Sequence, residues 1–488
     1  MDWIQSLRVG AAEELLSIIG IALLVGSAWG QGRRDARAIT WLAVLTLCAA
    51  AVLTYPALSH GARREAALAF GGLYSGDAFA AYAKLLIYAA AGASLLVAPG
   101  FFEKYRAMRS EYPVLVLFAV LGMGIMVSAT NLLTLYVGLE LNSLSAYVLA
   151  SFLKTDERSA EAGLKYFVLG GLASGILLFG MSLTYGFTGT ITFSVISTAL
   201  TGHASMGALF GLIFVLSGLA FKISAVPFHM WTPDVYEGAP TPVTTFFASA
   251  PKVAALALTM RVTLEAFGHQ AAAWQQIVSF VALASVVVGA LGAIGQSNLK
   301  RLLAYSSINN VGFMLVGLAS ASPQGAAAML VYLTIYVPMT IGGFVAVLML
   351  RDAEGTQLEQ ISDLAGLSRT RPMLALGLGS IMFSMAGIPF FFGFWGKFVV
   401  FQSAVNAGMV WLAAAAAVAS VIGAYYYLKV LKVMYFDEPA GRVTGRSDML
   451  HEWLLATCAV FVSPLGYLLT KGLTALTMTA AGVLFAPV

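Results

Sequence analysis

Four ionisable side chains stand inside apolar segments long enough to cross a bilayer, and through them this sequence can do chemistry. They are Glu140, Lys222, Lys252 and Lys397. A charge at the centre of a bilayer costs about 2.5–3.5 kcal/mol even on the lenient insertion scale, so such residues are rare and usually functional. Loss of water favours the neutral amine of a buried lysine, whereas a nearby carboxylate favours the ammonium. The four residues therefore predict a buried path for protons.

Two prolines next to these lysines predict broken helices. Pro227 follows Lys222 by five residues, and Pro389 precedes Lys397 by eight. A proline has no N–H to donate and crowds the preceding turn, so each break frees backbone carbonyls at membrane depth. Lys222 either satisfies those carbonyls or takes part in proton transfer. His229, two residues after the first proline, titrates close to physiological pH and is either structural or functional.

The remaining buried charges leave alternatives open. Glu140 lies roughly 20 Å from one end of its apolar segment and roughly 13 Å from the other, at 1.5 Å per helical residue. It is either a protonated structural acid or an ion-pair partner and proton carrier. Lys84 comes only seven residues after Asp77, so we expect it to reach outward to water or to pair with that acid.

The composition indicates that the bilayer is the main solvent. Charged residues make up 10% of the 488 residues, against about 25% in soluble domains, and the mean hydropathy is +0.85. The apolar runs are continuous and not alternating, which favours helices over a membrane barrel. We expect an all-α polytopic bundle of about fourteen spans, at residues 14–30, 38–58, 77–98, 112–128, 130–152, 162–187, 206–235, 242–264, 274–296, 301–320, 325–350, 373–408, 409–433 and 450–472.

The loop charges and the two breaks predict the topology. Connections after even-numbered spans hold only Arg63 and Arg64, with Arg261 at the end of the eighth span, and the other connections are rich in Lys and Arg. The positive-inside rule then places both termini outside the cytoplasm. The breaks fall in spans seven and twelve, which predicts two inverted five-helix repeats. The expected units are 1–110 with three spans, the repeats 111–266 and 267–435, and 436–488 with the last span.

Several kinds of site are not expected. Cys48 and Cys458 each stand alone in an apolar run, without the paired spacing of an iron–sulfur cluster, a zinc site or a disulfide framework. No glycine-rich phosphate loop follows a strand-like segment, and the net charge of +4 forms no basic patch. We therefore expect no metal, cofactor or nucleotide in this chain and no nucleic acid partner.

Long motifs resemble one family. The stretch PFHMWTPDVYEGAPTPVTTFFASAPKVAA at residues 227–255 resembles the signature of the antiporter-like membrane subunits of respiratory complex I, the proton-translocating NADH-quinone oxidoreductase. The segments 298–317, 361–372 and 386–401 fit the same family in order and spacing. The resemblance extends from the third span to nearly the end of the chain. The lysines at positions 252 and 397 match the residues that one subunit type of that family has there, so the chain resembles that subunit type.

The resemblance implies roles for the buried charges. Glu140 matches the family's glutamate of the fifth span, and Lys222 matches the lysine of the seventh span that is paired with it. Lys252 matches the lysine of the eighth span. Lys397 matches the lysine of the twelfth span, which leads to the exit.

One family feature is absent. Many relatives carry a histidine where this chain has Asn309 and Asn310. Any proton transfer at that point would use water or neighbouring hydroxyls, and Ser306, Ser307 and Tyr305 are the candidates.

The resemblance implies a proton-translocating membrane subunit driven by NADH:quinone electron transfer elsewhere. FMN, iron–sulfur clusters and quinone would lie in partner subunits. The expected partners are the neighbouring antiporter-like subunit M, the small membrane subunits and, indirectly, the peripheral arm. The expected location is a bacterial inner membrane, with both termini periplasmic. Two alternatives remain, namely a cation/proton antiporter, which would support growth of a salt-sensitive strain, and a structural subunit, whose charge variants would still pump protons.

Overall fold

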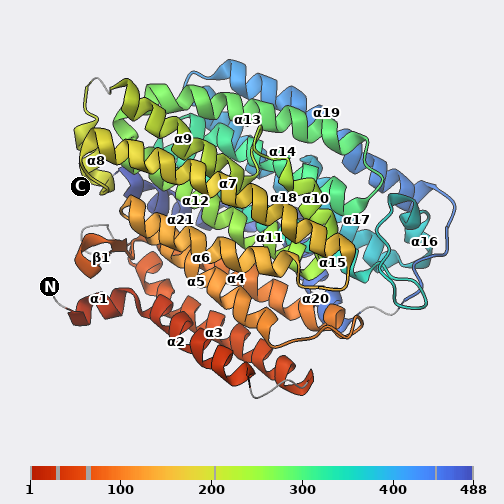
Figure 1. The fold of residues 1–488 in the computed structure, drawn as a ribbon. Helices are drawn as coiled ribbons and strands as arrows, with labels where there is room; N and C mark the ends of the chain where they lie inside the picture. Colours follow the sequence, from red (N-terminus) through yellow and green to blue (C-terminus); the bar gives the residue numbers. More distant parts are fainter. Residues whose placement is uncertain (1–2, 29–32, 62–66, 203–204, 446–447, 486–488) are drawn as a thin grey trace.

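The structure, a computed structural model, describes residues 3–28, 33–61, 67–202, 205–445 and 448–485, so the loop cations Arg63 and Arg64 lie outside the described residues. It is a bundle of helices that run along one another (Figure 1). Within the described ranges, 12 helices are long and apolar enough to cross a membrane, or up to 13 if a bent N-terminal pair counts as one span. The all-α membrane fold is confirmed, whereas the count of fourteen spans stays a prediction.

The N-terminal helices pack side by side at one edge of the bundle, coloured red to orange in Figure 1. A two-stranded hairpin joins α3 to α4, and Leu68 pairs with Ser75. These short strands lie outside the spans. The elements are α1 (Trp3–Val9), α2 (Ala11–Ser27), α3 (Arg33–Ser59), β1 (Leu68–Ala69), η2 (Phe70–Gly72), β2 (Tyr74–Ser75) and α4 (Ala78–Phe102).

The next elements include two interruptions near the expected sites. The seventh span is broken between α9 and α10, and the eighth is interrupted between α11 and α12, directly before Pro251. The elements are α5 (Glu111–Ser128), α6 (Leu132–Ala150), α7 (Glu157–Thr188), α8 (Phe193–Ala199), α9 (Met206–Ile223), α10 (Trp231–Gly238), α11 (Thr241–Phe247), α12 (Ala250–Arg261), η3 (Val262–Ala266) and η4 (Gly268–Gln270).

The C-terminal half contains the second expected break, between α17 and α18. The predicted end of the last span at residue 472 is wrong, because helical residues continue to Phe485 after an interruption at Pro464. The elements are α13 (Ala271–Ile294), α14 (Leu299–Ala319), α15 (Pro323–Met349), η5 (Ile361–Leu364), α16 (Leu367–Thr370), α17 (Pro372–Ala386), α18 (Phe392–Asn406), α19 (Val410–Phe436), α20 (Met449–Val462), η6 (Pro464–Leu469), α21 (Thr470–Gly482) and η7 (Val483–Phe485).

Small residues let neighbouring helices approach closely. A Cβ on Gly122 of α5 would lie 2.6 Å from the carbonyl oxygen of Gly138 on α6, and one on Gly180 of α7 would lie 2.9 Å from that of Gly211 on α9. Neither position has room for a side chain. Helices in lipid associate through such contacts because the hydrophobic effect does not drive them together there.

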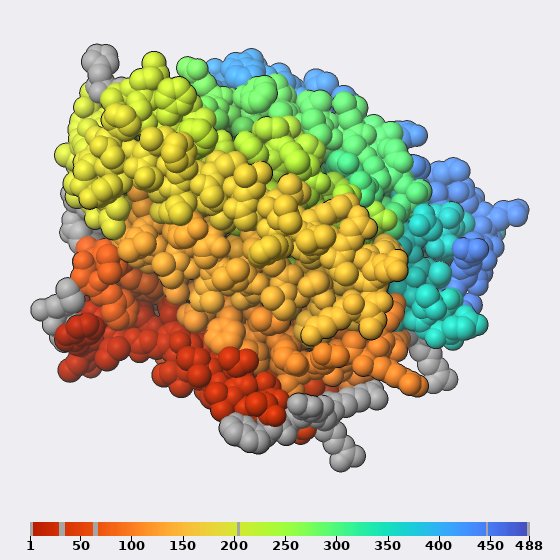
Figure 2. All heavy atoms as spheres, viewed as in Figure 1, coloured from red at the N-terminus to blue at the C-terminus, as the bar shows by residue number. Residues whose placement is uncertain are grey.

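The outer faces of the bundle remain apolar. The segment that contains α7, coloured orange to yellow, crosses the front of the molecule in Figure 2. On α7, Leu164, Phe167, Val168 and Leu172 all have exposed fractions above one half. Such a contiguous apolar face fits lipid or a neighbouring membrane protein, not water.

One local arrangement occurs twice. Asn131 caps α6 by accepting a hydrogen bond from Thr134 N, and its backbone forms an isolated antiparallel bridge with Thr192, after α7. Asn298 caps α14 by accepting from Arg301 N, and its backbone bridges to Gln360, after α15. The second helix of each expected repeat therefore starts in the same way, which supports the proposed repeats.

A set of buried ion pairs connects the N-terminal helices to the rest of the bundle. Arg261 is the last residue of α12. It donates to both carboxylate oxygens of Asp77, at 2.8 and 2.9 Å, and to Glu265 at 2.8 Å. Arg261 and Asp77 are completely buried. Because desolvated charges need partners, this set fixes the start of α4 against α12.

The expectation for Lys84 was wrong. Its side chain is buried, and its ammonium lies 2.7 Å from the carboxylate of Glu13 on α2 and donates to Tyr74 of the hairpin. Asp77, the predicted partner, is occupied by Arg261. Lys84 therefore joins α4 to α2 and does not reach outward to water.

Replacement of Arg261 by Met tests this buried set. We expect the free energy of unfolding to fall by about 3–5 kcal/mol, because two carboxylates would remain buried without their cation. The measurement is the thermal melting of the detergent-solubilised protein. Lys432→Met is the control, since Lys432 pairs with Asp437 on the surface and such pairs contribute about 1 kcal/mol at most. Equal melting of both variants would contradict the prediction.

Candidate functional site

At the first helix break, two side chains donate hydrogen bonds to carbonyls at the end of α9. Helix α9 ends at Ile223, and Ser224 adopts a left-handed conformation with φ 62°. The indole N–H of Trp231 donates to Phe221 O at 3.0 Å, and the ammonium of Lys252 donates to Ile223 O at 2.8 Å. Lys252 is 1% exposed. The end of α9 is therefore satisfied by side chains of α10 and α12.

Lys222 does not satisfy these carbonyls. Its ammonium donates to Ser143 Oγ at 2.8 Å and lies 3.5 Å from both Tyr147 Oη and Ser174 Oγ. Three hydroxyls from α6 and α7 therefore surround it. Of the two interpretations left open by the sequence, the structural one loses its support, because the freed carbonyls have other partners.

Glu140 lies one turn before Ser143 on α6 and is half-buried. The described residues form no ion pair with it, and its Oε1 has no hydrogen-bond partner among them. The direct Glu140–Lys222 pair implied by the family resemblance is therefore absent from this conformation. The two charges act on each other through space, with the Ser143 hydroxyl next to the ammonium.

The second break repeats the chemistry of the first. Helix α17 ends at Ala386, and Gly387 has φ 78°. The ammonium of Lys397, from α18, donates to Met385 O and Ala386 O at 3.1 Å each and to Ser420 Oγ at 3.0 Å. A Cβ on Gly387 would lie 2.9 Å from the Lys397 side chain. This position needs glycine both for the turn and for the lysine.

A buried group of hydroxyls lies on α14 between the two breaks. Ser307 Oγ is 2.7 Å from Tyr336 Oη, and Ser306 Oγ is 2.5 Å from Tyr427 Oη. The hydroxyl of Tyr332 donates to Asn310 Oδ1 at 2.5 Å. Each hydroxyl can both donate and accept a hydrogen bond, so a proton can pass between the two members of each hydroxyl pair.

The buried hydroxyl side chains lie near both lysine sites. At one end, the phenol of Tyr236 lies beside Ser307, and the Tyr236 ring is 6.0 Å from the Lys252 ammonium. At the other end, the ring of Tyr332 packs against Gly396, next to Lys397 in the chain. The polar groups thus extend from one break to the other inside the bundle.

Four residues expected from the sequence lie apart from this path. Tyr305 packs against Gly292 of α13, away from Ser306 and its partners. His229 is half-buried in the connection before α10, and its Nδ1 has no hydrogen-bond partner among the described residues. The two prolines, Pro227 and Pro389, are exposed at the surface of the chain.

Tyr332, Tyr336 and Tyr427 belong to the site but were not predicted from the sequence. Tyr332 and Tyr336 stand four residues apart and so share one face of α15. That spacing was the available signal, although a buried aromatic stripe is usually only packing. Tyr427 meets Ser306 across 121 residues of chain, and no local pattern predicts such a contact.

The described residues contain no group of three or more His, Cys, Asp or Glu side chains that could hold a metal ion. Both cysteines are unpaired, with Cys458 buried and Cys48 exposed. The ionisable groups of the site are lysines, one glutamate and hydroxyls, and such groups can bind and release protons.

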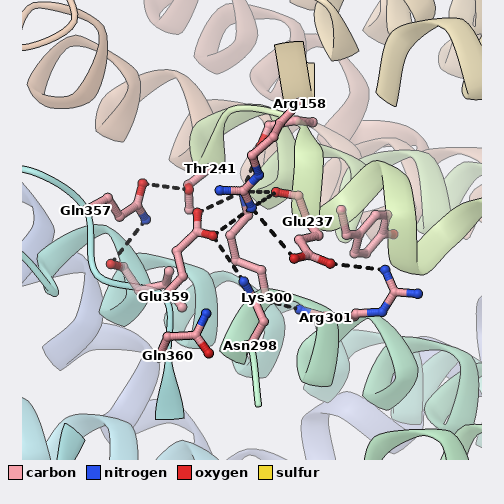
Figure 3. A network of polar contacts seen from close by, with 12 residues as sticks. Arg158, Glu237, Thr241, Asn298, Lys300, Arg301, Gln357, Glu359 and Gln360 are labelled. Carbon is pink, nitrogen blue, oxygen red and sulfur yellow. Dashed lines mark hydrogen bonds and ion pairs between the residues drawn. The ribbon is translucent and has the colours of Figure 1, made fainter. Parts of the chain in front are cut away.

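A polar network joins helices of the two expected repeats at one end of the bundle (Figure 3). Glu359, in the connection after α15, accepts hydrogen bonds from Arg158 of α7 at 2.8 Å and from Asn298 at 3.1 Å. Lys300 of α14 lies 3.5 Å from the same carboxylate. Burial favours the neutral acid, but the Lys300 charge and the Arg158 hydrogen bond together hold the pKa of Glu359 below its usual value.

Comparisons with known proteins agree with this geometry. A family model described as NADH:quinone oxidoreductase/Mrp antiporter, transmembrane, matches residues 129–423. Subunit N of NADH-quinone oxidoreductase from Erythrobacter litoralis is 64% identical over 485 residues, which cover 99% of each chain. The similarity includes the whole of the site described above.

Two solved structures share the fold. A chain of respiratory complex I from Thermus thermophilus with bound aureothin has a TM-score of 0.81 at 32% identity, covering 95% of this chain and 99% of that one. A chain of the Mrp complex from Dietzia sp. DQ12-45-1b has a TM-score of 0.85 at 24% identity, covering 100% and 98%. At the lower identity, the likeness shows the fold alone.

The pKa of Glu359 predicts an acid-sensitive contribution to stability. A carboxyl whose pKa is lower in the folded than in the unfolded protein stabilises fully above its unfolded pKa, and that contribution is lost as the pH falls through the folded pKa. Between about pH 6 and pH 4, the apparent melting temperature of the unmodified protein should drop by roughly 1–2 °C more than that of Glu359→Gln. Glu354→Gln, exposed in the same connection, should behave like the unmodified protein. Parallel curves for all three proteins would contradict this.

Proposed function

Because the chain belongs to the NADH:quinone oxidoreductase/Mrp antiporter family, we propose that it translocates protons as the subunit N component of an NADH-quinone oxidoreductase. The proposed path uses Glu140, Lys222, Lys252 and Lys397. The observation that carries it is that Lys252 and Lys397 each donate to carbonyls freed by a helix break, with two buried hydrogen-bonded hydroxyl pairs on the helices between them.

The path starts at Glu140 and Lys222. Glu140 is partly exposed on the surface of the chain, where a charge on a neighbouring subunit can act on it. When Glu140 is ionised it favours the ammonium form of Lys222, and when its charge is neutralised that support is lost. Lys222 then gives a proton to a hydroxyl of Ser143, Tyr147 or Ser174 as that hydroxyl passes its own proton onward, so the hydroxyl stays neutral and the lysine becomes a neutral amine.

The path continues through Lys252 to Lys397. A proton that reaches Lys252 passes by Tyr236 to the hydroxyls on α14, with water completing the chain where the hydroxyls do not touch. Ser306 and Ser307 take part directly through their tyrosine partners. Each lysine accepts one proton as the preceding group gives one up, so the interior gains no net charge in a completed transfer.

The energy comes from outside this chain. FMN, iron–sulfur clusters and quinone are proposed to lie in partner subunits, so the coupling here is electrostatic and conformational. The neighbouring antiporter-like subunit M and the small membrane subunits are the proposed direct partners, and the peripheral arm acts indirectly. The proposed setting is a bacterial inner membrane, with both termini in the periplasm and two inverted repeats between them.

A cation/proton antiporter is the alternative function. The matching family model keeps it as a candidate, since its description names the Mrp antiporter beside NADH:quinone oxidoreductase. The 64% identity to a subunit N favours the respiratory complex. Growth of a salt-sensitive strain that expresses this chain alone would support the antiporter, and its failure to grow would support the complex.

Neutral replacements test the path in the assembled complex. We expect Glu140→Gln, Lys222→Ala and Lys397→Ala each to slow NADH-driven proton pumping by about tenfold or more, because a missing proton carrier costs roughly 10²–10⁴ in general acid–base catalysis. The measurement is acidification of inverted membrane vesicles with a fluorescent dye, normalised to the amount of assembled complex.

Lys432→Ala is the matched control. Lys432 is a lysine of α19 that pairs with Asp437 at the surface and does not touch the path. It should pump at the normal rate. Normal pumping per electron in all three path variants would refute the proposed route, and failure to pump only because the complex does not assemble would assign the charges a structural role.

A further inference from the structure

Helix α10 carries part of the Lys252 site but has little covalent support. It is eight residues long. The non-helical connection Ser224–Met230 precedes it, and Ala239 and Pro240 separate it from α11. A helix this short is not stable by itself, so its position must come from side-chain contacts.

One face of α10 forms the surroundings of Lys252. The ring of Trp231 lies 5.9 Å from the ammonium, and Tyr236 lies on the same side. Trp231 is also stacked against Tyr166 of α7, with ring centroids 4.5 Å apart. A shift of α10 would therefore move both rings relative to Lys252 and would break the indole hydrogen bond to Phe221 O.

The opposite face of α10 is held by cations from two other helices. Arg301 of α14 donates to Asp234 at 2.7 Å and to Glu237 at 3.0 Å, so one guanidinium bridges both acids. Lys165 of α7 donates to the other oxygen of Asp234 at 2.8 Å. These side chains are about one-third exposed. A single pair of this kind contributes little, but a guanidinium shared by two acids restrains the helix at two points.

The end of α10 is held by backbone contacts. The ammonium of Lys300 donates to Glu237 O and Ala239 O at 2.8 Å each, and Arg158 donates to Glu237 O at 3.2 Å. Lys300 is 2% exposed. Cations are favoured here because the last carbonyls of a helix are unpaired and carry a partial negative charge.

We propose that Arg301 and Lys300 are positioning residues that clamp α10 against α14, so that Trp231 and Tyr236 hold Lys252 in its place for proton transfer. The clamp acts on transfer through the Lys252 site, which includes the rings of Trp231 and Tyr236. This inference rests on the proposed function, since it assigns a role in the same path. It adds that the network in Figure 3 fixes the position of α10 at the first helix break, although the charged groups of this network do not carry protons themselves.

The experiment uses the assembled complex with Arg301→Ala, Lys252→Ala and the double variant. Loosening α10 should raise backbone hydrogen exchange across residues 231–238 and slow proton pumping at least about twofold, because small misplacements of reacting groups are costly. The double variant should pump no worse than Lys252→Ala alone, since both changes act at one place. Arg301→Lys should restore part of the pumping, because an ammonium can contact one of the two acids.

Arg442→Ala is the control, since Arg442 pairs with Asp363 at 2.8 Å away from α10. It should change neither pumping nor exchange in α10. If Arg301→Ala does not assemble, Asp234→Asn removes one charge with little change of shape and takes its place.

The outcomes separate the clamp from the path. Normal pumping and normal exchange with Arg301→Ala would overturn the clamp, and so would losses that add in the double variant. If Lys252→Ala itself pumps normally, the proposed function fails at that residue, whereas hydrogen exchange still reports whether Arg301 holds α10. Increased exchange, slower pumping and no additivity together support the proposal.

Discussion

A carbonyl freed by a helix break has no water to bond with inside a membrane, and the rest of this structure depends on how that requirement is met. At both breaks the donor is a lysine ammonium, Lys252 on Ile223 O and Lys397 on the end of α17. The benefit is mutual, since the carbonyl dipoles replace the water that the ammonium has lost. A buried positive charge and a broken helix would each be unfavourable alone, and together they stabilise one another.

The two halves of the bundle share a scaffold and differ in charge. In the first half, the bridge beside Asn131 includes the backbone carbonyl of Ile191, which accepts from Leu132 N. At the equivalent place in the second half, the carbonyl that accepts from Leu299 N belongs to Glu359. The side chain of Glu359 enters the ion network, whereas an isoleucine cannot. The same backbone arrangement therefore supports a charged junction beside Asn298 and a polar but uncharged junction beside Asn131.

Local signals in the sequence predicted the breaks and the lysines near them, because proline acts on its own turn and a charge in an apolar run stands out. Partners far apart in the chain were beyond such signals. Lys84 pairs with Glu13 and not with Asp77, which is nearer in the chain, and Lys222 contacts hydroxyls and not Glu140. Such contacts depend on how neighbouring helices pack. Helix packing depends on small residues on both helices, and a single sequence does not show which helices lie together.

The hydrogen bond between Lys252 and Ile223 O links the protonation of this lysine to the end of α9. The nitrogen that we propose as a proton carrier also anchors that helix end, and the bond is charge-assisted only while the nitrogen is an ammonium. After proton release it becomes a neutral bond of roughly half the strength. In the proposed path, departure of the proton would thus weaken the contact that holds the end of α9, and arrival of the next proton would strengthen it again.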